Sequence, residues 1–268
     1  MTAAAPYFDA SPARRLTAFD LLLIVIFLAG LYLGVALQIT EKIPLTCAPS
    51  GAAGLIMLWR RRDDMQPKHI AGLLGVLALS LAWIFLATDL NYLSKRFTGL
   101  VQFTYSLVIG YGFFLTIIRA GRRQFANILL GFCLFIIIGC LLENYGGLRA
   151  VSDKVREKIY DAGIVYDADL RDQLLYGRIR PKLFTSEPSA VTFAYTYYCS
   201  VWLLVSPWRW KLPVYCGLVG LAMVVLPGPT LVLMLLLAIP YLVLLSGSQR
   251  RRSPVRMAGM IALSVILL

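Results

Sequence analysis

Three basic residues and one acidic residue fall within ten positions of the stretch GRIRPKLFTSEPSAVTFAYTYY, residues 177–198. They are Arg178, Arg180, Lys182 and Glu187. Pro181 disfavours the helical region for the residue before it, so we expect Arg180 in extended backbone, where alternate side chains point the same way. Two guanidinium groups on one face can each bind phosphate oxygens in bidentate fashion, and Lys182 continues the row. The spacing therefore predicts a diphosphate-binding row.

Glu187 lies just beyond this row, where the chain enters an apolar segment. A carboxylate beside an anion-binding row can act as a general base toward a hydroxyl group. A structural interpretation stays open, in which Ser186 caps the next helix, Glu187 complements its dipole and Pro188 takes an early helical position. The basic side chains would then contact lipid phosphates or acidic residues of the same loop.

Three tyrosines and a tryptophan lie in the helix expected after the row. They are Tyr195, Tyr197, Tyr198 and Trp202. Aromatic side chains gather at membrane interfaces, so an interfacial belt is the favoured interpretation. Stacking on a sugar ring or an isoprenoid chain is the alternative.

The composition predicts an all-α, polytopic membrane protein. The chain of 268 residues is 59% hydrophobic and 15% charged, with a mean hydropathy of +0.74. A soluble domain carries about 25% charged residues, and a membrane helix needs about 20 apolar ones. We expect about nine spans in a single membrane domain, 1–268. They cover 17–37, 43–59, 69–88, 100–118, 125–145, 189–207, 212–226, 230–246 and a segment from Met257.

Two features of these spans have further consequences. The ninth stops at Leu268 in mid-helix, so we expect the natural chain to continue and to carry further functional residues. The seventh and eighth are short and are separated by Pro227-Gly228-Pro229, which predicts a tight helical hairpin or a re-entrant pair.

Charge sets the predicted orientation. With a cytoplasmic N-terminus and single crossings, 15 of the 26 Lys and Arg residues and 4 of the 14 Asp and Glu residues lie inside. The inside then has a net charge of +11 and the outside +1, as the positive-inside rule requires. The total of +12 therefore reports membrane topology, and nucleic acid is not an expected partner. The predicted location is the bacterial inner membrane.

The one long connection, 146–187, is predicted to be external and to hold two short amphipathic helices on the membrane surface. For the first, Ser152 is the candidate N-cap and Gly163 the stop, with Val155, Ile159 and Ala162 on one face. For the second, Asp167 opens the helix and Gly177 closes it, and Leu170 and Leu174 share the apolar side.

Neither a cofactor nor a metal is expected. The five cysteines form no C-x-x-C pair and fall in or beside apolar segments, which is typical of small buried hydrophobes. The chain has no glycine-rich phosphate loop and no cluster of metal-ligating residues.

The stretch RIRPKLFTSEPSAVTFAY, a basic loop followed by Leu-Phe-x-x-Glu-Pro-Ser and a membrane helix, resembles the external loop of the O-antigen polymerase and ligase superfamily. This resemblance, of the exopolysaccharide polymerase type, implies glycosyl transfer at the outer face of the inner membrane. The donor would be an oligosaccharide on undecaprenyl diphosphate. An acceptor hydroxyl would attack the anomeric carbon and the lipid diphosphate would leave.

The resemblance assigns roles to the four charged residues. Arg178 and Arg180, with Lys182 beside them, would stabilise the charge growing on the diphosphate, and Glu187 would accept the proton. It also implies that no metal is required, and that a chain-length regulator or export proteins are partners. Ligases of the superfamily use an external His, whereas His69 is predicted to be cytoplasmic, which disfavours the ligase.

Two other classes stay open. A transporter of lipid-linked glycan predicts ionisable residues in mid-span, but Asp20, Asp89 and Glu143 lie near span ends. A non-catalytic membrane subunit of an export complex would use the external loop for docking. The remaining polar groups at span ends, Glu143 and the turn with Lys95 and Arg96, are expected to be solvated.

Overall fold

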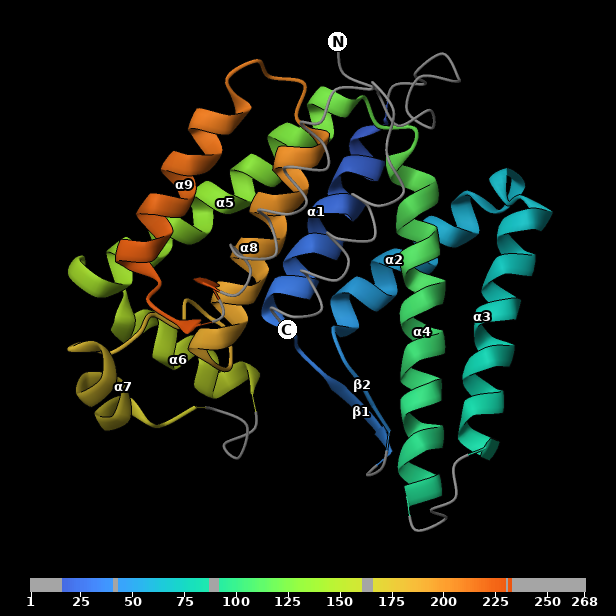
Figure 1. The fold of residues 1–268 in the computed structure, drawn as a ribbon, viewed down its shortest axis with the longest axis horizontal. Coiled ribbons are helices and arrows are strands. Elements are labelled where there is room, and N and C mark those ends of the chain that lie inside the picture. Colours follow the sequence, from blue (N-terminus) through green and yellow to red (C-terminus); the bar gives the residue numbers. More distant parts are fainter. Residues whose placement is uncertain (1–15, 41–42, 87–91, 161–165, 230, 233–268) are drawn as a thin grey trace, which may run out of the picture. The chain divides into compact units, whose positions relative to one another are not determined.

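The computed structural model describes residues 16–40, 43–86, 92–160, 166–229 and 231–232, and this part is predominantly α-helical (Figure 1). The predicted helical class is confirmed, with one short β-hairpin in addition. Three described helices are long and apolar enough to cross a membrane: α3 (Pro67–Leu86), α4 (Leu93–Ile117) and α5 (Arg122–Tyr145). The contacts divide the described residues into two compact units, a first that ends at Gly121 and a second that begins at Arg122.

Helix α1 (Ala18–Leu33) opens the described part of the first unit, and local signals set both of its ends. Thr17 and Asp20 form a capping box at its start. Gly34 ends it in the left-handed region, at φ 66°, which glycine adopts without steric cost. The Asp20 carboxylate is buried and accepts a hydrogen bond of 2.8 Å from the Arg61 guanidinium, so the start of α1 is fixed to the end of the next helix, α2 (Ala48–Arg60).

The segment predicted as the second span is different in the structure. Residues 37–60 form an antiparallel hairpin and then a helix, namely β1 (Leu37–Thr40), β2 (Ile43–Leu45) and α2 (Ala48–Arg60). The single 3₁₀ turn Arg62–Asp64 follows. At 1.5 Å per residue the 13 residues of α2 span about 20 Å, less than the roughly 30 Å of a bilayer core. The predicted spans 17–37 and 43–59 were therefore too long, because apolar strand residues had been counted as helix.

Small residues let the helices of the first unit approach closely. A Cβ on Gly30 of α1 would overlap Ser50 of α2, and a Cβ on Gly112 of α4 would overlap the carbonyl oxygen of Gly54 in α2. Such contacts are how membrane helices gain packing energy without a hydrophobic effect between them. Phe27 and Phe113 also stack with ring centroids 4.2 Å apart.

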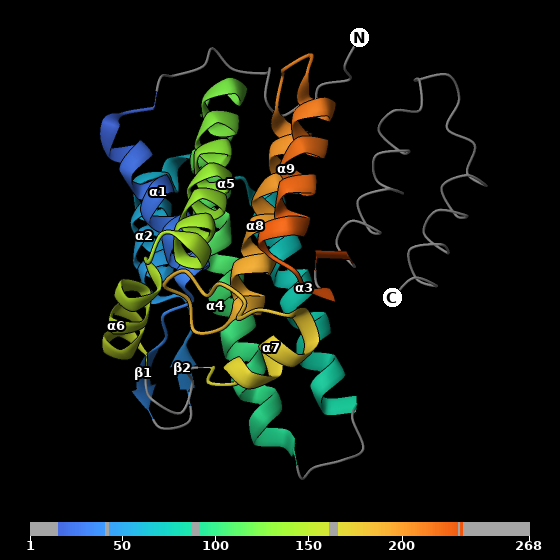
Figure 2. The same cartoon turned by 90° about the vertical axis from the view of Figure 1, so that its left-hand side faces the viewer.

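The second unit gathers helices α8 (Pro188–Val205) and α9 (Lys211–Val225) around α5 (Figure 2). Arg122, at the start of α5, donates to the carbonyl oxygens of Leu204 and Val205, the last residues of α8. The Tyr195 hydroxyl of α8 donates to the Leu218 carbonyl oxygen of α9 at 2.8 Å. These bonds link the three helices at different heights.

The aromatic residues of α8 do not form the predicted interfacial belt. Tyr195, Tyr198 and Trp202 are all buried among the helices, whereas Tyr197 is exposed. The three buried residues belong to the core, which their spacing could not indicate because it also fits a helix face at an interface.

Two short helices, α6 (Arg149–Ile159) and α7 (Asp169–Tyr176), lie at the end of the bundle where α5 ends and α8 begins (Figures 1 and 2). They are the two helices predicted for the loop 146–187. The predicted stop of α7 at Gly177 is confirmed, since Gly177 is left-handed at φ 68°. Leu170 and Leu174 of α7 are exposed, as a helix on a membrane surface would require. The predicted stop of α6, Gly163, lies outside the described residues.

The other predicted spans are recovered with shifted ends. Those at 69–88, 100–118, 125–145, 189–207 and 212–226 correspond to α3, α4, α5, α8 and α9. Helices α8 and α9, with 18 and 15 residues, do not join the three helices that meet the length and hydropathy of a full span. The predicted span 230–246, apart from residues 231 and 232, and the one from Met257 lie outside the described residues.

Replacing Gly112 by Ala tests the close packing of α4 on α2. The new methyl would meet backbone atoms of α2, and overpacking of this kind costs about 1–3 kcal/mol. We expect the melting temperature of the purified protein in detergent to fall by several degrees. Gly110→Ala on the same helix is the control, since a Cβ there meets no atom within 4 Å and alanine favours the helix. Equal melting temperatures for the two variants would contradict this packing.

Candidate functional site

The segment 177–187, called the basic loop below, is held by a buried carboxylate. Glu143 of α5 is only 3% exposed, and it accepts the backbone N–H groups of Lys182 at 2.9 Å and of Leu183 at 2.6 Å. The prediction that Glu143 is solvated was wrong. A buried charge is tolerated where backbone donors replace its water, so this contact ties the loop to the end of α5.

Leu183 completes the attachment one turn earlier on α5. Its side chain is fully buried against Gly139, where a Cβ would lie 2.6 Å from a Leu183 methyl carbon. Leu183 and Phe184 both have positive φ, 29° and 66°, which is uncommon for residues with a Cβ. Such backbone persists only where its surroundings hold it, and here they include the Glu143 carboxylate.

Helix α6 supplies the other side of the attachment. Ser152, predicted as the N-cap of this helix, lies inside it, because α6 begins at Arg149. Its buried hydroxyl oxygen accepts the N–H of Phe184 at 3.0 Å, and the Tyr160 hydroxyl donates to the Phe184 carbonyl oxygen at 3.1 Å. The backbone N–H of Phe184 is thus bonded to Ser152 within α6, and its carbonyl oxygen to Tyr160, the C-cap residue of α6.

Arg156 is the centre of this hydrogen-bond network. Its guanidinium is buried, with 2% of the residue exposed, and donates to the carbonyl oxygens of Thr185 at 2.8 Å and Ser186 at 3.2 Å. It also donates to the Tyr166 carbonyl oxygen at 3.4 Å and pairs with Asp153 at 2.7 Å. The planar five-donor guanidinium suits this role, which lysine cannot reproduce.

The predicted basic row divides in the structure. Arg180 donates to Asp172 at 2.9 Å and to the Tyr166 hydroxyl at 3.3 Å, while Lys182 pairs with Asp169 at 2.8 Å. Both cations also lie over the Tyr166 ring, at 5.8 Å and 5.6 Å from its centroid. Arg180 and Lys182 therefore converge on one side of the loop, as the alternating pattern predicted. Their present partners are acidic residues of the loop, which was the structural interpretation.

Arg178 points elsewhere, so a single row of three is not formed. Its guanidinium donates to the Tyr145 hydroxyl at 3.2 Å and to the carbonyl oxygen of Val224. Asn144 donates to the next carbonyl oxygen, that of Val225, at 3.4 Å. These carbonyls end α9, where the helix dipole attracts cations, and this attraction explains the departure of Arg178 from the row.

Burial and charge give Arg180 a distinct environment. Its partner Asp172 is fully buried, and the Arg180 guanidinium also lies 4.8 Å from the centroid of the Tyr176 ring. Burial alone would lower the pKa of Arg180, but hydrogen bonds to Tyr166 and Asp172 and the charge of Asp172 raise it above its ordinary value. Arg180 is thus a fixed positive charge. Its Nη1 group makes no hydrogen bond with a described residue.

Glu187 is the charged residue of the four whose side chain is exposed. It is the N-cap residue of α8, but its carboxylate makes no capping bond and no ion pair within the described part of the chain. The predicted cap by Ser186 is wrong, whereas Pro188 at the first helical position is confirmed. The Glu187 carbonyl oxygen accepts the Thr185 hydroxyl at 2.8 Å, so its backbone is fixed while its carboxylate is free for other partners.

A pocket of about 460 Å³ lies between α6 and the segment that leads into α7, bordered by the basic loop. It is lined by Asp153, Arg156, Glu157, Tyr160, Tyr166, Asp167, Asp169 and Lys182. Four carboxylates outnumber two cations, so the pocket does not suit a polyanion. Carboxylates that accept hydroxyl hydrogens, with tyrosine rings beside them, are suited to a ligand rich in hydroxyl groups.

The pocket is joined directly to the segment that carries Glu187. The N–H of Tyr166 donates to the Ser186 carbonyl oxygen at 3.0 Å, and Arg156 donates to the same oxygen. The pocket wall is therefore hydrogen-bonded to the carbonyl oxygen of Ser186, the residue before Glu187.

Comparisons with protein-family models, with characterised proteins and with solved structures found no match.

Replacing Arg156 by Lys tests whether this network holds the basic loop. Lysine keeps the charge but cannot reach three carbonyl oxygens in one plane, and each lost bond to a buried group costs about 1–3 kcal/mol. We expect native-state cleavage by chymotrypsin after Phe184 to become at least about tenfold faster. Arg171→Lys, at an exposed position of α7, should cleave at the wild-type rate. Equal rates for both variants would mean that Arg156 does not hold the loop.

Proposed function

We propose that the chain polymerises saccharide repeat units, taking them from undecaprenyl-diphosphate-linked donors at the outer face of the bacterial inner membrane. The observation that carries this proposal is the pocket of about 460 Å³ with its four carboxylates and two tyrosines, next to a loop that ends in the exposed carboxylate of Glu187. The Ser186 carbonyl oxygen, one residue before Glu187, is hydrogen-bonded to two residues of the pocket wall, Arg156 and Tyr166, and this link supports pairing an acceptor in the pocket with Glu187 as its base.

The proposed topology has about nine spans, with a cytoplasmic N-terminus and the loop 146–187 outside. The distribution of Lys and Arg supports it, and so do the three apolar helices α3, α4 and α5. On this topology the exposed leucines of α7, Leu170 and Leu174, lie against the outer membrane surface. The pocket then opens on the side where lipid-linked glycans are polymerised.

The proposed reaction uses the residues in separate roles. The acceptor hydroxyl attacks the anomeric carbon of the donor, the bond from this carbon to the diphosphate breaks, and Glu187 takes the hydroxyl proton. Arg180, which does not line the acidic pocket, stabilises the charge that develops on the leaving diphosphate, and Lys182 contributes when its ammonium leaves Asp169. The Nη1 group of Arg180 is available for this, since Asp172 and Tyr166 engage its Nε and Nη2 groups. Arg178 contributes only if it exchanges the α9 carbonyl for phosphate.

One observation favours a second candidate, a non-catalytic membrane subunit of an export complex. Arg178, Arg180 and Lys182 all have partners within the chain, which is the pattern of a structural loop. The exposed leucines of α7 would then contact a partner protein instead of lipid. A transporter of lipid-linked glycan has no comparable support.

The two candidates differ at Glu187. For the polymerase, Glu187→Gln removes the general base, and we expect glycan chain extension to fall by at least about a hundredfold. The measurement is the ladder of chain lengths on gels, in cells that depend on this protein. Asp63→Asn, at an exposed position of the other unit, is the matched control and should leave the ladder unchanged. A wild-type ladder from a normal amount of the Glu187→Gln protein would exclude the polymerase and leave the subunit.

A further inference from the structure

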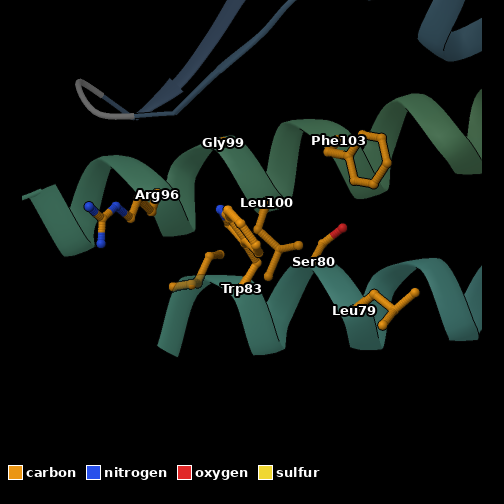
Figure 3. Close-up of a pocket in the computed structure, with 8 residues that line it drawn as sticks. Leu79, Ser80, Trp83, Arg96, Gly99, Leu100 and Phe103 are labelled. Carbon is orange, nitrogen blue, oxygen red and sulfur yellow. The ribbon is translucent and has the colours of Figure 1, made fainter. Parts of the chain in front are cut away.

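Helices α3 and α4 of the first unit enclose a groove that the proposed reaction does not use. It has a volume of about 620 Å³, within the range of ligand pockets, and its walls come from both helices (Figure 3). Trp83 and Ile84 of α3 and Leu100 and Phe103 of α4 make it apolar. Arg96 is the charged residue among the described residues that line the groove, and it lies at one end (Figure 3).

The shape of the groove leaves room for a chain-like ligand. A Cβ on Gly99, which lines the groove from α4, would meet no atom within 4 Å. Ser80 is polar, but its hydroxyl donates to the Val76 carbonyl oxygen of its own helix at 2.9 Å. A ligand in the groove would therefore make apolar contacts along its length and a polar contact with Arg96 at its end.

Arg96 lacks a partner for part of its guanidinium. Its Nη1 atom is buried and makes no hydrogen bond in the described structure, although the sequence had suggested a solvated turn. Helices α3 and α4 contain no Asp or Glu, and Lys95 adds a second positive charge in the first turn of α4. The dipole at the start of α4 is opposed by the dipole at the end of α3, so the positive potential at this end comes from the two side-chain charges. This end of the groove is suited to an anion.

The occupant must combine an anionic head with apolar chains. Both helices are long and apolar enough to cross a membrane, so the surrounding solvent is lipid. We propose that the groove binds one anionic phospholipid, with its phosphate oxygens on Arg96 and an acyl chain along Trp83 and Leu100. A charge-assisted hydrogen bond from Nη1 to phosphate would satisfy the buried donor. The proposal is independent of glycosyl transfer, since none of the residues of the pocket beside the basic loop takes part.

The test is native mass spectrometry of the full chain, released from detergent after titration with phosphatidylglycerol or with zwitterionic phosphatidylcholine. We expect one phosphatidylglycerol to bind at least about tenfold more tightly than phosphatidylcholine. Arg96→Gln should remove about that factor, the loss of one charge-assisted hydrogen bond. Lys95→Gln is the matched control and should change the affinity by less than about threefold, because Lys95 does not line the groove.

A second variant keeps the proposal testable if Arg96→Gln does not fold. Gly99→Leu places a side chain in the open groove while the charge of Arg96 is kept, and we expect it to weaken lipid retention by a similar factor. Equal affinities for the two lipids, or wild-type binding by Arg96→Gln or by Gly99→Leu, would overturn the proposal. The groove would then be a contact surface for bulk lipid or for another helix.

Discussion

The contact between the Glu143 carboxylate and the N–H groups of Lys182 and Leu183 is the interaction on which the candidate site depends. It joins residues about 40 positions apart and brings the basic loop onto the end of α5. A hydrogen bond to a charged group contributes about 1.5–3 kcal/mol, and Glu143 makes two of them with the loop backbone. The positions of Arg180, Lys182 and Glu187 are consequences of this attachment.

Arg156 is the counterpart of Glu143. Each of these two charged side chains binds backbone groups of the basic loop, and the structure shows no contact between them. Glu143 accepts the N–H groups at 182 and 183, and Arg156 donates to the carbonyl oxygens at 185 and 186. The positive φ values of Leu183 and Phe184 turn the backbone between these two sets. The loop is thereby fixed through its main chain, while Arg178, Arg180 and Lys182 keep side-chain partners and the Glu187 carboxylate stays exposed.

The fold class followed from the sequence because apolar length and composition act locally. The same is true of the stop at Gly177 and the start at Pro188, where one residue type decides the backbone. The hairpin β1–β2 was missed, since Leu37 and Ile43–Leu45 extend the apolar runs of the predicted spans 17–37 and 43–59.

The candidate site was predicted only in part, because its partners are distant in the sequence. The four charged residues of the basic loop stood out by type and spacing. Glu143, Arg156 and Asp172 did not, since a carboxylate or guanidinium on a helix is normally solvated and only the folded chain shows what covers it. One signal was available in the sequence. Ser152 and Arg156 are four residues apart and so share one face of α6, and this polar face, rather than the apolar face that was predicted, contacts the basic loop.

Amide hydrogen exchange of Lys182 and Leu183, measured in the intact protein in lipid nanodiscs, tests the attachment most directly. The account predicts that both amides exchange at least about a hundredfold more slowly than in an unstructured peptide, which corresponds to about 3 kcal/mol of local opening free energy. Both should lose this protection together in Glu143→Ala, which removes both acceptor oxygens, while amides in the middle of α8 keep theirs. Exchange of the wild-type Lys182 and Leu183 amides at unstructured rates would contradict the account.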